Sequence, residues 1–521
     1  MSVLALAAVI AAPPGPIPPP AVPKADIQVG AFYFPGWSQA DRWYCMLANK
    51  KVQHPLLGYY REGDPEVADW HIKWAAEHGV GFFAYDYYTH EGSQMLEAAL
   101  DGFLASRFAD RMKFCLNWCN HAPAPTMTAE HLAQFADLVI PKYLKHPSYL
   151  RLGGKPLVII LSGYSFVKTL GVEGARRAFA DFDSRCKDAG LPGVRIWSCE
   201  GEIVGEQALR DALAAGIEGF CLYNYPYAGT GMNGPGRYME AAYSHMTDQG
   251  EGLWKHWATL TGGRFWPTVM PGWDRRPWLR DNDLVRTGST PDLFRDALTR
   301  ARRYVNADRV VMIEAWNEWG EGSILEPSVE HRFAYLDAVR SVFCPTAGAH
   351  KDLTPADLGR PSPGMALQLP FVDGWRFDFG LQGWTGTGIA DLRPEHGAVH
   401  FRTTTGDPQI TAPANYTDCS RYGKVRVRMR ASAPAGGPAA VRGQLFWSTV
   451  EFAMREDTSV GFDVQADGRW HTYELDLSSS PRWSGLADGL RLDPADRPDM
   501  DVVVDEIAFV PTRRTSRAAA P

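Results

Sequence analysis

The sequence has few cysteines, no large excess of either charge and no long apolar run. Eight cysteines in 521 residues are too few for a disulfide framework. Cys115, Cys119, Cys199 and Cys221 lie in or beside apolar, strand-like runs, which is typical of buried thiols. The net charge is −7 with both signs mixed along the chain, so neither nucleic acid nor anionic lipid is an expected partner. No internal segment approaches the roughly 20 apolar residues of a membrane span.

The amino terminus consists of a short apolar run with small residues, followed by a proline-rich stretch from Pro13 to Pro23. It lacks the basic residues that usually begin a secretory signal. The apolar run and the small residues still predict a signal peptide and proline-rich segment over residues 1–24. We therefore expect a secreted or periplasmic protein.

Short apolar runs alternate with amphipathic stretches from residue 27 onward. The runs predict strands at 27–34, 81–85, 113–118, 156–161, 194–198, 219–223, 265–270 and 309–313. The stretches predict helices at 65–78, 129–144, 174–189, 207–215, 291–305 and 330–343. This alternation over about 320 residues favours an α/β fold, a (β/α)8 TIM barrel over residues 25–345, rather than an open doubly wound sheet.

The chain after the barrel has a different composition. Residues 346–370 are rich in Pro, Gly and Ala without periodicity, which predicts a linker. Residues 371–512 hold short alternating strands broken by Gly, Pro and Asp, which predict an antiparallel β-sandwich of jelly-roll type. Residues 513–521 are expected to form a tail. Trp447, Trp470 and Trp483 are either sandwich core or a sugar platform, and Asp505 is a candidate ligand for a structural calcium ion.

Barrel active sites lie at the carboxyl ends of the strands, and these ends are rich in aromatic, carboxylate and carboxamide side chains. Aromatic rings stack on sugar C–H surfaces and polar groups bind sugar hydroxyls. The 18 Trp and 20 Tyr of the chain fit a carbohydrate ligand, although core packing accounts for many of them. The residues expected to line the sugar subsites are Tyr33, Trp37, Asp86, Tyr87, Asn117, Trp118, Tyr223, Asn224, Trp273, Asp274, Trp316 and Asn317.

The eighth predicted strand runs into the acidic stretch I-E-A-W-N-E-W-G-E-G-S-I-L-E-P. Glu318 and Glu321 can face one cup only if the chain turns, which Gly320 and Gly322 permit. Cleavage of an acetal requires a proton donor and a second carboxylate, so this pair is the predicted catalytic pair. The alternative is that these glutamates cap the following helix or pair with arginines such as Arg332.

Three other motifs have weaker functional interpretations. Gly229-Thr-Gly-Met-Asn-Gly234 matches a dinucleotide fingerprint in letters but runs into Pro235 instead of opening a helix. Asp281-Asn-Asp283 resembles the Asp-x-Asp of some glycosyltransferases, yet a solvated loop explains it as well. The spacing of Cys115, Cys119 and His121 matches no standard zinc pattern. We therefore expect neither a metal nor an organic cofactor in the catalytic domain.

The stretch Ala315-Trp-Asn-Glu-Trp-Gly-Glu-Gly322 with Leu325-Glu-Pro327 resembles the signature of the glycoside hydrolase family 99-like group. That group includes endo-α-mannanases, endomannosidases and the WbsX-type proteins often labelled glycosyltransferases. Further matching segments are Tyr33-Phe-Pro-Gly-Trp37, Gly79-Val-Gly-Phe-Phe83, Phe114-Cys-Leu-Asn-Trp118, His146-Pro-Ser-Tyr149, Gly154-Lys-Pro156 and Trp273-Asp274 ahead of Gly288-Ser-Thr-Pro291. Gly320 stands where family 99 proper has histidine, and Trp118-Cys-Asn-His121 differs from the Trp-Ala-Asn-Glu frequent in the WbsX branch.

The resemblance implies that Glu318 acts as base on the sugar 2-hydroxyl, giving a 1,2-anhydro intermediate. It implies that Glu321 protonates the leaving group and then activates water, with net retention. We thus expect a retaining glycoside hydrolase acting on a poly- or oligosaccharide, with a carbohydrate-binding-like sandwich. The competing interpretations are a WbsX-type glycosyltransferase and a non-catalytic carbohydrate-binding protein. The sugar, the linkage and the oligomeric state stay open.

Overall fold

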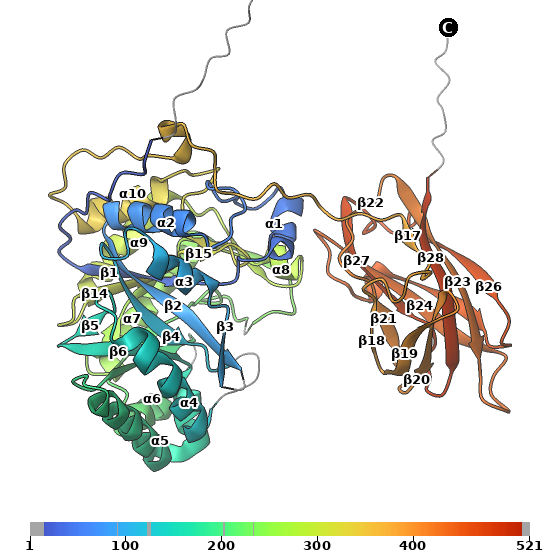
Figure 1. Ribbon diagram of the computed structural model, residues 1–521, viewed down its shortest axis with the longest axis horizontal. Helices are drawn as coiled ribbons and strands as arrows, with labels where there is room; N and C mark the ends of the chain where they lie inside the picture. Colours follow the sequence, from blue (N-terminus) through green and yellow to red (C-terminus); the bar gives the residue numbers. More distant parts are fainter. Residues whose placement is uncertain (1–14, 91, 122–126, 202–203, 233, 513–521) are drawn as a thin grey trace, which may run out of the picture.

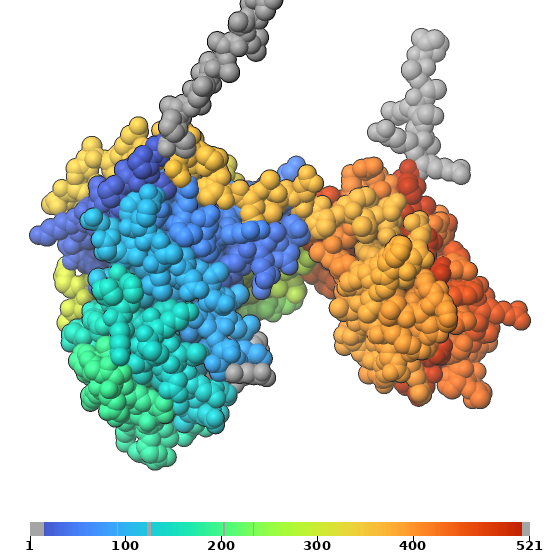
Figure 2. Space-filling model, viewed as in Figure 1, coloured from blue at the N-terminus to red at the C-terminus, as the bar shows by residue number. Residues whose placement is uncertain are grey.

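The computed structural model describes residues 15–90, 92–121, 127–201, 204–232 and 234–512. They form two bodies with separate hydrophobic cores, a barrel and a sandwich (Figures 1 and 2). None of the described helices is long and apolar enough to cross a membrane. The predicted signal peptide lies mostly outside the described residues, and the predicted tail lies entirely outside them.

Parallel strands form the barrel, as predicted. In sheet order, β8, β7, β6, β4, β2, β1 and β14 pair in turn. Strand seven is split at Pro267, so that β10 pairs with β8 while β11 pairs with β14 and completes the ring. Proline has no N–H for the ladder, which explains the break. The strands are β1 (Gln28–Tyr33), β2 (Val80–His90), β4 (Lys113–Trp118), β6 (Lys155–Leu161), β7 (Arg195–Glu200), β8 (Gly219–Leu222), β10 (Phe265–Trp266), β11 (Thr268–Val269) and β14 (Val310–Ile313).

Helices cover the outside of the barrel: α2 (Pro65–Glu77), α3 (Ala98–Ala105), α4 (Ala129–Val139), α5 (Gly163–Asp188), α6 (Glu206–Ala215), α7 (Tyr243–Leu260), α9 (Pro291–Ala301) and α10 (Ala334–Phe343) (Figure 1). The sequence patterns did not predict α3 or α7. Gly250 lies inside α7, because a Cβ there would come 2.7 Å from the ring of Tyr225. Close packing against Tyr225 therefore requires glycine at this position, although glycine lowers the helix propensity of α7. Helix α5 also begins before the predicted 174, since residues on both sides of Gly171, at φ 68°, are helical.

The other helices and strands of the barrel body are short. They are η1 (Ala40–Trp43), α1 (Tyr44–Ala48), β3 (Ser93–Met95), η2 (Ile140–Leu144), β5 (Arg151–Leu152), β9 (Met239–Ala242), β12 (Trp273–Asp274), α8 (Arg276–Leu279), β13 (Leu284–Thr287), η3 (Arg302–Tyr304), β15 (Asn317–Glu318) and β16 (Ser323–Ile324). Strands β15 and β16 form a small antiparallel hairpin directly after β14. This hairpin carries the acidic stretch.

Residues 346–370, predicted as a linker, lie along the barrel and are not a free connection. The indole Nε1–H of Trp74 donates to the Leu353 carbonyl at 2.8 Å, and the amide of Met365 donates to the Tyr59 carbonyl at 2.7 Å. Arg360 pairs with Glu66 at 2.6 Å beside η4 (Pro355–Leu358). Apolar side chains in a Pro-rich segment thus cover the barrel surface.

The carboxyl-terminal body is a sandwich of two antiparallel sheets, as predicted. One sheet has the order β19-β20-β28-β23-β26 with β17, and the other β18-β21-β27-β24-β25 with β22. The bounds are β17 (Gly374–Trp375), β18 (Thr385–Thr387), β19 (Ile389–Glu395), β20 (Ala398–Thr403), β21 (Gln409–Thr411), β22 (Thr417–Asp418), β23 (Tyr422–Ser432), β24 (Ala440–Thr449), η5 (Glu456–Thr458), β25 (Ser459–Gln465), β26 (His471–Asp476), β27 (Leu486–Asp493) and β28 (Asp501–Pro511).

Of the three tryptophans that the sequence proposed as a sugar platform, Trp447 and Trp483 belong to the core. Trp470 is 39% exposed, and Arg428 and Arg430 lie over its ring. Asp505 pairs with Arg428, so a cation already neutralises the candidate calcium ligand.

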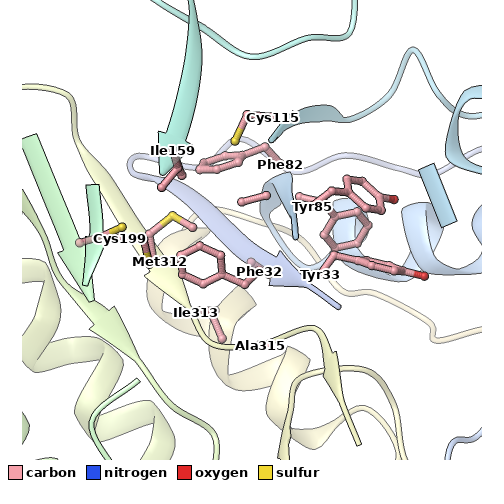
Figure 3. Close-up of a cluster of buried hydrophobic side chains, with 14 of the residues drawn as sticks. Phe32, Tyr33, Phe82, Tyr85, Cys115, Ile159, Cys199, Met312, Ile313 and Ala315 are labelled. Carbon is pink, nitrogen blue, oxygen red and sulfur yellow. The ribbon is translucent and has the colours of Figure 1, made fainter. Parts of the chain in front are cut away.

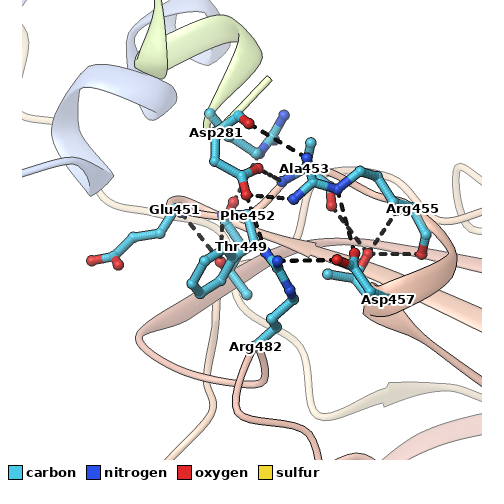
Figure 4. Close-up of polar contacts among 10 residues, drawn as sticks. Asp281, Thr449, Glu451, Phe452, Ala453, Arg455, Asp457 and Arg482 are labelled. Carbon is cyan, nitrogen blue, oxygen red and sulfur yellow. Dashed lines mark hydrogen bonds and ion pairs between the residues drawn. The ribbon is translucent and has the colours of Figure 1, made fainter. Parts of the chain in front are cut away.

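Ion pairs join the two bodies (Figure 4). Asp281 of the barrel binds Arg455 and, at 3.1 Å, Arg482 of the sandwich, and it accepts a hydrogen bond from the Ala453 amide at 2.9 Å. Arg280 pairs with Asp488 at 2.7 Å. Asp281, half of the Asp-x-Asp motif, therefore makes a domain contact.

Candidate active site

The β15–β16 hairpin directs carboxylates into the cup at the carboxyl ends of the strands. The pairing of Glu318 with Ser323 leaves residues 319–322 as its tip. A Cβ on Gly320 would come 1.9 Å from the Trp278 ring, and Gly322 has a φ of 66°. The two glycines are therefore required here, and the chain makes the turn that the sequence predicted.

Glu318 lies in the cup beneath the half-buried Tyr223 and beside Asp86 of β2. The Tyr223 hydroxyl lies 2.7 Å from Asp86 Oδ2 and 3.1 Å from Glu318 Oε1. The Asn117 amide donates to Asp86 Oδ1 at 2.8 Å. A single hydroxyl proton cannot satisfy two carboxylates, so the second short contact favours a proton on one of them. Strands β2 and β4, together with the loop after β8, thus position the partners of Glu318.

Glu321 is less buried than Glu318. Its side chain is 13% exposed, whereas Glu318 is 4% exposed. Arg275, after β12, lies 3.3 Å from Glu321 Oε1 and pairs with Asp283 at 3.0 Å. Neither Glu318 nor Glu321 pairs with Arg332 among the described contacts, and the cap of α10 is Phe333. Of the two alternative structural roles, helix capping by these glutamates is not observed among the described residues, whereas pairing with an arginine is observed between Glu321 and Arg275.

Burial raises the pKa of each carboxyl group in the cup. It raises the pKa of Glu318 well above 4.5, and the charges of Glu321, Asp86 and Glu314 raise it further. It raises the pKa of Glu321 to about 7 although Arg275 opposes the shift, and that of Asp86 to about 7 although Tyr223 and Asn117 oppose it. Asp86 and Glu321 thus exchange protons near neutral pH, as an acid–base site requires.

Several polar atoms in the cup have no hydrogen-bond partner within the described ranges. They are Glu318 Oε2, Asn117 Oδ1 and Glu314 Oε1. Buried polar atoms are rarely left unpaired, because each costs about 1–3 kcal/mol. A ligand rich in hydroxyl groups would satisfy them.

Several aromatic residues predicted to line the cup point away from it. Tyr33 bonds His71 of α2 at 3.1 Å and packs beside Tyr85, whereas Phe32 lies with Met312 on the other side of β1 (Figure 3). Tyr87 and Trp118 pack on Phe135 of α4, and Trp316 packs on His71. Tyr33, Tyr87 and Trp118 face away because side chains alternate along a strand, so only every second one faces the interior. Trp316 lies between β14 and β15, outside any strand, and packs on the outer side through its contact with His71.

The remaining predicted residues divide into two groups. Trp37 is 1% exposed, and its ring stacks on that of Trp43 with the centroids 4.2 Å apart. Trp273 is buried, with Arg275 over its ring. The side chain of Asn317 accepts from the Phe34 amide and donates to the Phe34 carbonyl. These three support the cup from below. Asp86, Asn117 and Tyr223 lie at the cup, Asn224 is half-buried directly after Tyr223, and Asp274 pairs with Arg276 next to the hairpin.

Tyr88, Arg275 and Glu314 are site residues that the sequence analysis missed. Burial raises the pKa of Tyr88, and the nearby Cys119, Asp86 and Glu318 raise it further. Ser323 donates to Glu314 Oε2 at 2.7 Å, and Glu314 is fully buried. Glu314 directly follows an apolar strand, which is a usable sequence signal, whereas Arg275 had none beyond its place after Trp273-Asp274.

The buried carboxyl groups predict a stability that falls as pH rises. The Asp86 pKa is raised from 3.8 to about 7. Between these values the folded chain holds a proton that the unfolded chain has released, so stability decreases from about pH 4 to about pH 7. The expected result is a melting temperature that is higher at pH 5 than at pH 8. In Asp86→Asn the decrease is smaller, though not absent, since Glu62 and Glu200 also have raised pKa values.

Thermal unfolding in matched buffers from pH 5 to pH 8 measures this effect. The control is Asp110→Asn, which changes a carboxylate that is 74% exposed. Equal pH profiles for Asp86→Asn and the unmodified protein would contradict the assignment of a buried proton to the cup.

Comparison with known proteins gives a family and several relatives. The family model described as "Glycosyltransferase WbsX" matches residues 37–339. An uncharacterized protein WxcX of Xanthomonas campestris is 27% identical over 311 residues, 54% of this chain and 42% of its own length. The mouse glycoprotein endo-alpha-1,2-mannosidase is 23% identical over 300 residues, 54% of this chain and 59% of its own. The chain thus spans about half the length of the curated relatives that it matches.

A solved GH99 endo-alpha-mannosidase of Bacteroides thetaiotaomicron is 17% identical, covers 61% of this chain and 97% of its own, and superimposes with a TM-score of 0.44. The resemblance to the family 99-like and WbsX-like group that the sequence predicted is confirmed by the family model and the endomannosidase match.

Proposed function

The chain belongs to the WbsX glycosyltransferase family, and we propose that its own activity is that of a retaining glycoside hydrolase acting on a poly- or oligosaccharide. The observation that supports this most strongly is that one hairpin carries the carboxyl groups of Glu318 and Glu321 in a largely buried cup, where burial and then the charge of Glu321 raise the pKa of Glu318. Glycosidases use two such groups, one as acid and one as base or nucleophile. The unpaired oxygens of Glu318 and Asn117 are suited to accept sugar hydroxyl donors.

In the proposed mechanism Glu318 takes the proton of the sugar 2-hydroxyl as that oxygen attacks the anomeric carbon. Glu321 gives its proton to the departing glycosidic oxygen. Water, deprotonated by Glu321, then opens the 1,2-anhydro ring, and Glu318 returns its proton to the 2-oxygen. Two displacements give net retention. The roles follow the family 99 resemblance and not the pKa values, because burial raises the pKa of Glu318 well above its ordinary value and that of Glu321 to about 7.

A glycosyltransferase is the second candidate, favoured by the family's description. Such an enzyme needs a site for a nucleotide-sugar phosphate. The two motifs that could supply one, the Asp-x-Asp and the glycine-rich motif, have other structural roles. Asp281 binds sandwich arginines, while Asp283 binds Arg275 and accepts from Tyr227. The Gly229 motif is followed by turns and β9, not by a helix. These contacts favour the hydrolase.

The sandwich fits the same proposal as a glycan-binding partner of an exported enzyme. A cavity of about 290 Å³ lies between the two bodies, with Tyr238 and Arg276 on one wall and Phe452 and Arg482 on the other. Arg276 holds Asp274, whose amide donates to the Glu321 carbonyl. Arg276 and Asp274 thus connect one wall of this cavity to the acidic hairpin, and the proposal assigns to the cavity further sugar units of an extended glycan.

A glycan panel tests the proposed activity. Purified protein is incubated with bacterial, plant and fungal polysaccharides and with mannose-containing oligosaccharides, and new reducing ends are measured. In parallel, nucleotide-sugars with Mg²⁺ or Mn²⁺ are offered with the same acceptors. We expect reducing ends from at least one glycan without added nucleotide or metal. Sugar transfer that depends on nucleotide-sugar, with no hydrolysis, would support the glycosyltransferase instead.

A further inference from the structure

Two histidines and an aspartate converge at the end of the barrel opposite the acidic cup. His78 follows the last residue of α2 and leads through Gly79 into β2, so it lies at the amino ends of the strands. His350 and Asp352 come from the segment after α10, the helix that packs beside α2 (Figure 1). One ligand atom from each of the three lies within 4.8 Å of the other two.

The two distances from Asp352 match the edges of a metal coordination polyhedron. Asp352 Oδ1 lies 3.1 Å from His78 Nε2 and 3.2 Å from His350 Nε2. Zinc bonds of about 2.0–2.1 Å give ligand–ligand distances of about 3.3 Å in a tetrahedron. None of the three atoms makes a hydrogen bond of acceptable geometry in the described part of the chain. They therefore lie at contact distance without pointing at one another.

The Trp74 carbonyl fixes which nitrogen of a neutral His78 ring is free to bind metal. Its Nδ1 lies 2.6 Å from the Trp74 carbonyl, which can only accept, so Nδ1 carries the proton. In the neutral ring the lone pair is then on Nε2, the atom that faces Asp352. A backbone carbonyl on the other ring nitrogen is the usual support of a histidine that binds zinc. The side chain of His78 is fully buried, and that of His350 is 13% exposed.

Glu77 provides a fourth donor. Its Oε2 lies 3.7 Å from His350 Nε2 and makes no hydrogen bond within the described residues. Its other oxygen accepts from Lys73 at 2.6 Å and from the Ala21 amide at 3.1 Å. Two neutral imidazoles and two carboxylates compensate the charge of a divalent ion.

We propose that His78, His350 and Asp352, with Glu77 completing the shell, form a structural zinc site. The ion ties the segment that leaves α10 to the end of α2, where Trp74 already holds Leu353. The site is separate from the acidic cup and does not depend on the hydrolase assignment. A proton on His78 Nε2, which would pair it with Asp352 and with Asp337 at 3.6 Å, is the competing explanation of the same cluster.

Metal analysis and Co²⁺ binding test the proposal. The full chain is stripped with a chelator, incubated with Zn²⁺, desalted and analysed by mass spectrometry, and we expect about one zinc per chain. His350→Ala should hold less than about a tenth of that amount. His396→Ala, which changes an imidazole that is 94% exposed in the sandwich, should bind as the unmodified protein does.

Zn²⁺ should also raise the melting temperature of the stripped protein and of His396→Ala but not of His350→Ala. In the unmodified protein, Co²⁺ should give the intense visible bands of a tetrahedral site, a result that does not depend on the folding of any variant. Desalted protein without zinc, with Co²⁺ giving only the pale spectrum of the aqua ion and with an unchanged melting temperature, would overturn the proposal in favour of the protonated His78.

Discussion

Replacing Glu318 or Glu321 with glutamine is expected to lower kcat/KM on the cleaved glycan by about 10³-fold or more, because each variant removes one proton-transfer group. Glutamine keeps the size of the side chain, so glycan binding should persist. Glu330→Gln is the matched control, since Glu330 lies in the same part of the sequence, is 36% exposed and pairs with His54. Full turnover in both cup variants would remove the pair from the mechanism.

A substrate with a good leaving group separates the two roles. Fluoride departs without a proton, so in the first turnover the variant that lacks the acid should release fluoride from a glycosyl fluoride of the same sugar far faster than it cleaves the glycan. The variant that lacks the base should be slow on both. The proposed mechanism predicts this rescue for Glu321→Gln. Rescue of Glu318→Gln alone would exchange the roles, a result compatible with Arg275 holding a negative charge on Glu321.

Replacing Glu326 with alanine is expected to reduce the unfolding free energy of the barrel by about 3–5 kcal/mol, because it leaves buried donors unpaired. Glu326 is 2% exposed. It accepts from the Tyr60 hydroxyl at 2.6 Å and the Trp319 indole at 3.0 Å, and it contacts His71 Nε2 at 3.1 Å. This glutamate therefore belongs to the structure beneath the cup, unlike its neighbours in the motif.

Urea denaturation of the barrel transition measures the effect, with Glu330→Ala as the surface control. Glu326→Gln retains one acceptor oxygen and should lose less stability than Glu326→Ala. A loss below about 1 kcal/mol in Glu326→Ala would show that the buried network contributes little.

The sequence predicted the barrel strands well but not the faces that their residues occupy. Every strand of a parallel barrel is covered on the outside and packed on the inside, so both faces are apolar and alternation is hidden. Tyr33, Tyr87 and Trp118 were therefore assigned to the cup only because they stand at strand ends. Asp86 and Asn117, one residue earlier in each case, do face it. Since alternate residues of a strand face the same side, an inward-facing Asp86 implies that Tyr87 faces outward, away from the cup.

Long-range packing explains the other differences. Gly250 in α7 responds to the ring of Tyr225, which is distant in sequence. Arg275 becomes a site residue only because the β15–β16 hairpin brings Glu321 to it. The cluster of His78 with His350 and Asp352 joins positions more than 270 apart, which no local pattern relates. The acidic hairpin itself could be predicted, since its glycines and glutamates are adjacent in the chain.

The anomeric configuration of the first product tests the central claim most directly. A glycan cleaved by the unmodified protein is followed by ¹H NMR from the first minutes, before mutarotation. If Glu318 and Glu321 act together on one sugar ring by two displacements, the new reducing end appears first with the configuration of the cleaved bond. Initial release of the opposite anomer would contradict this account.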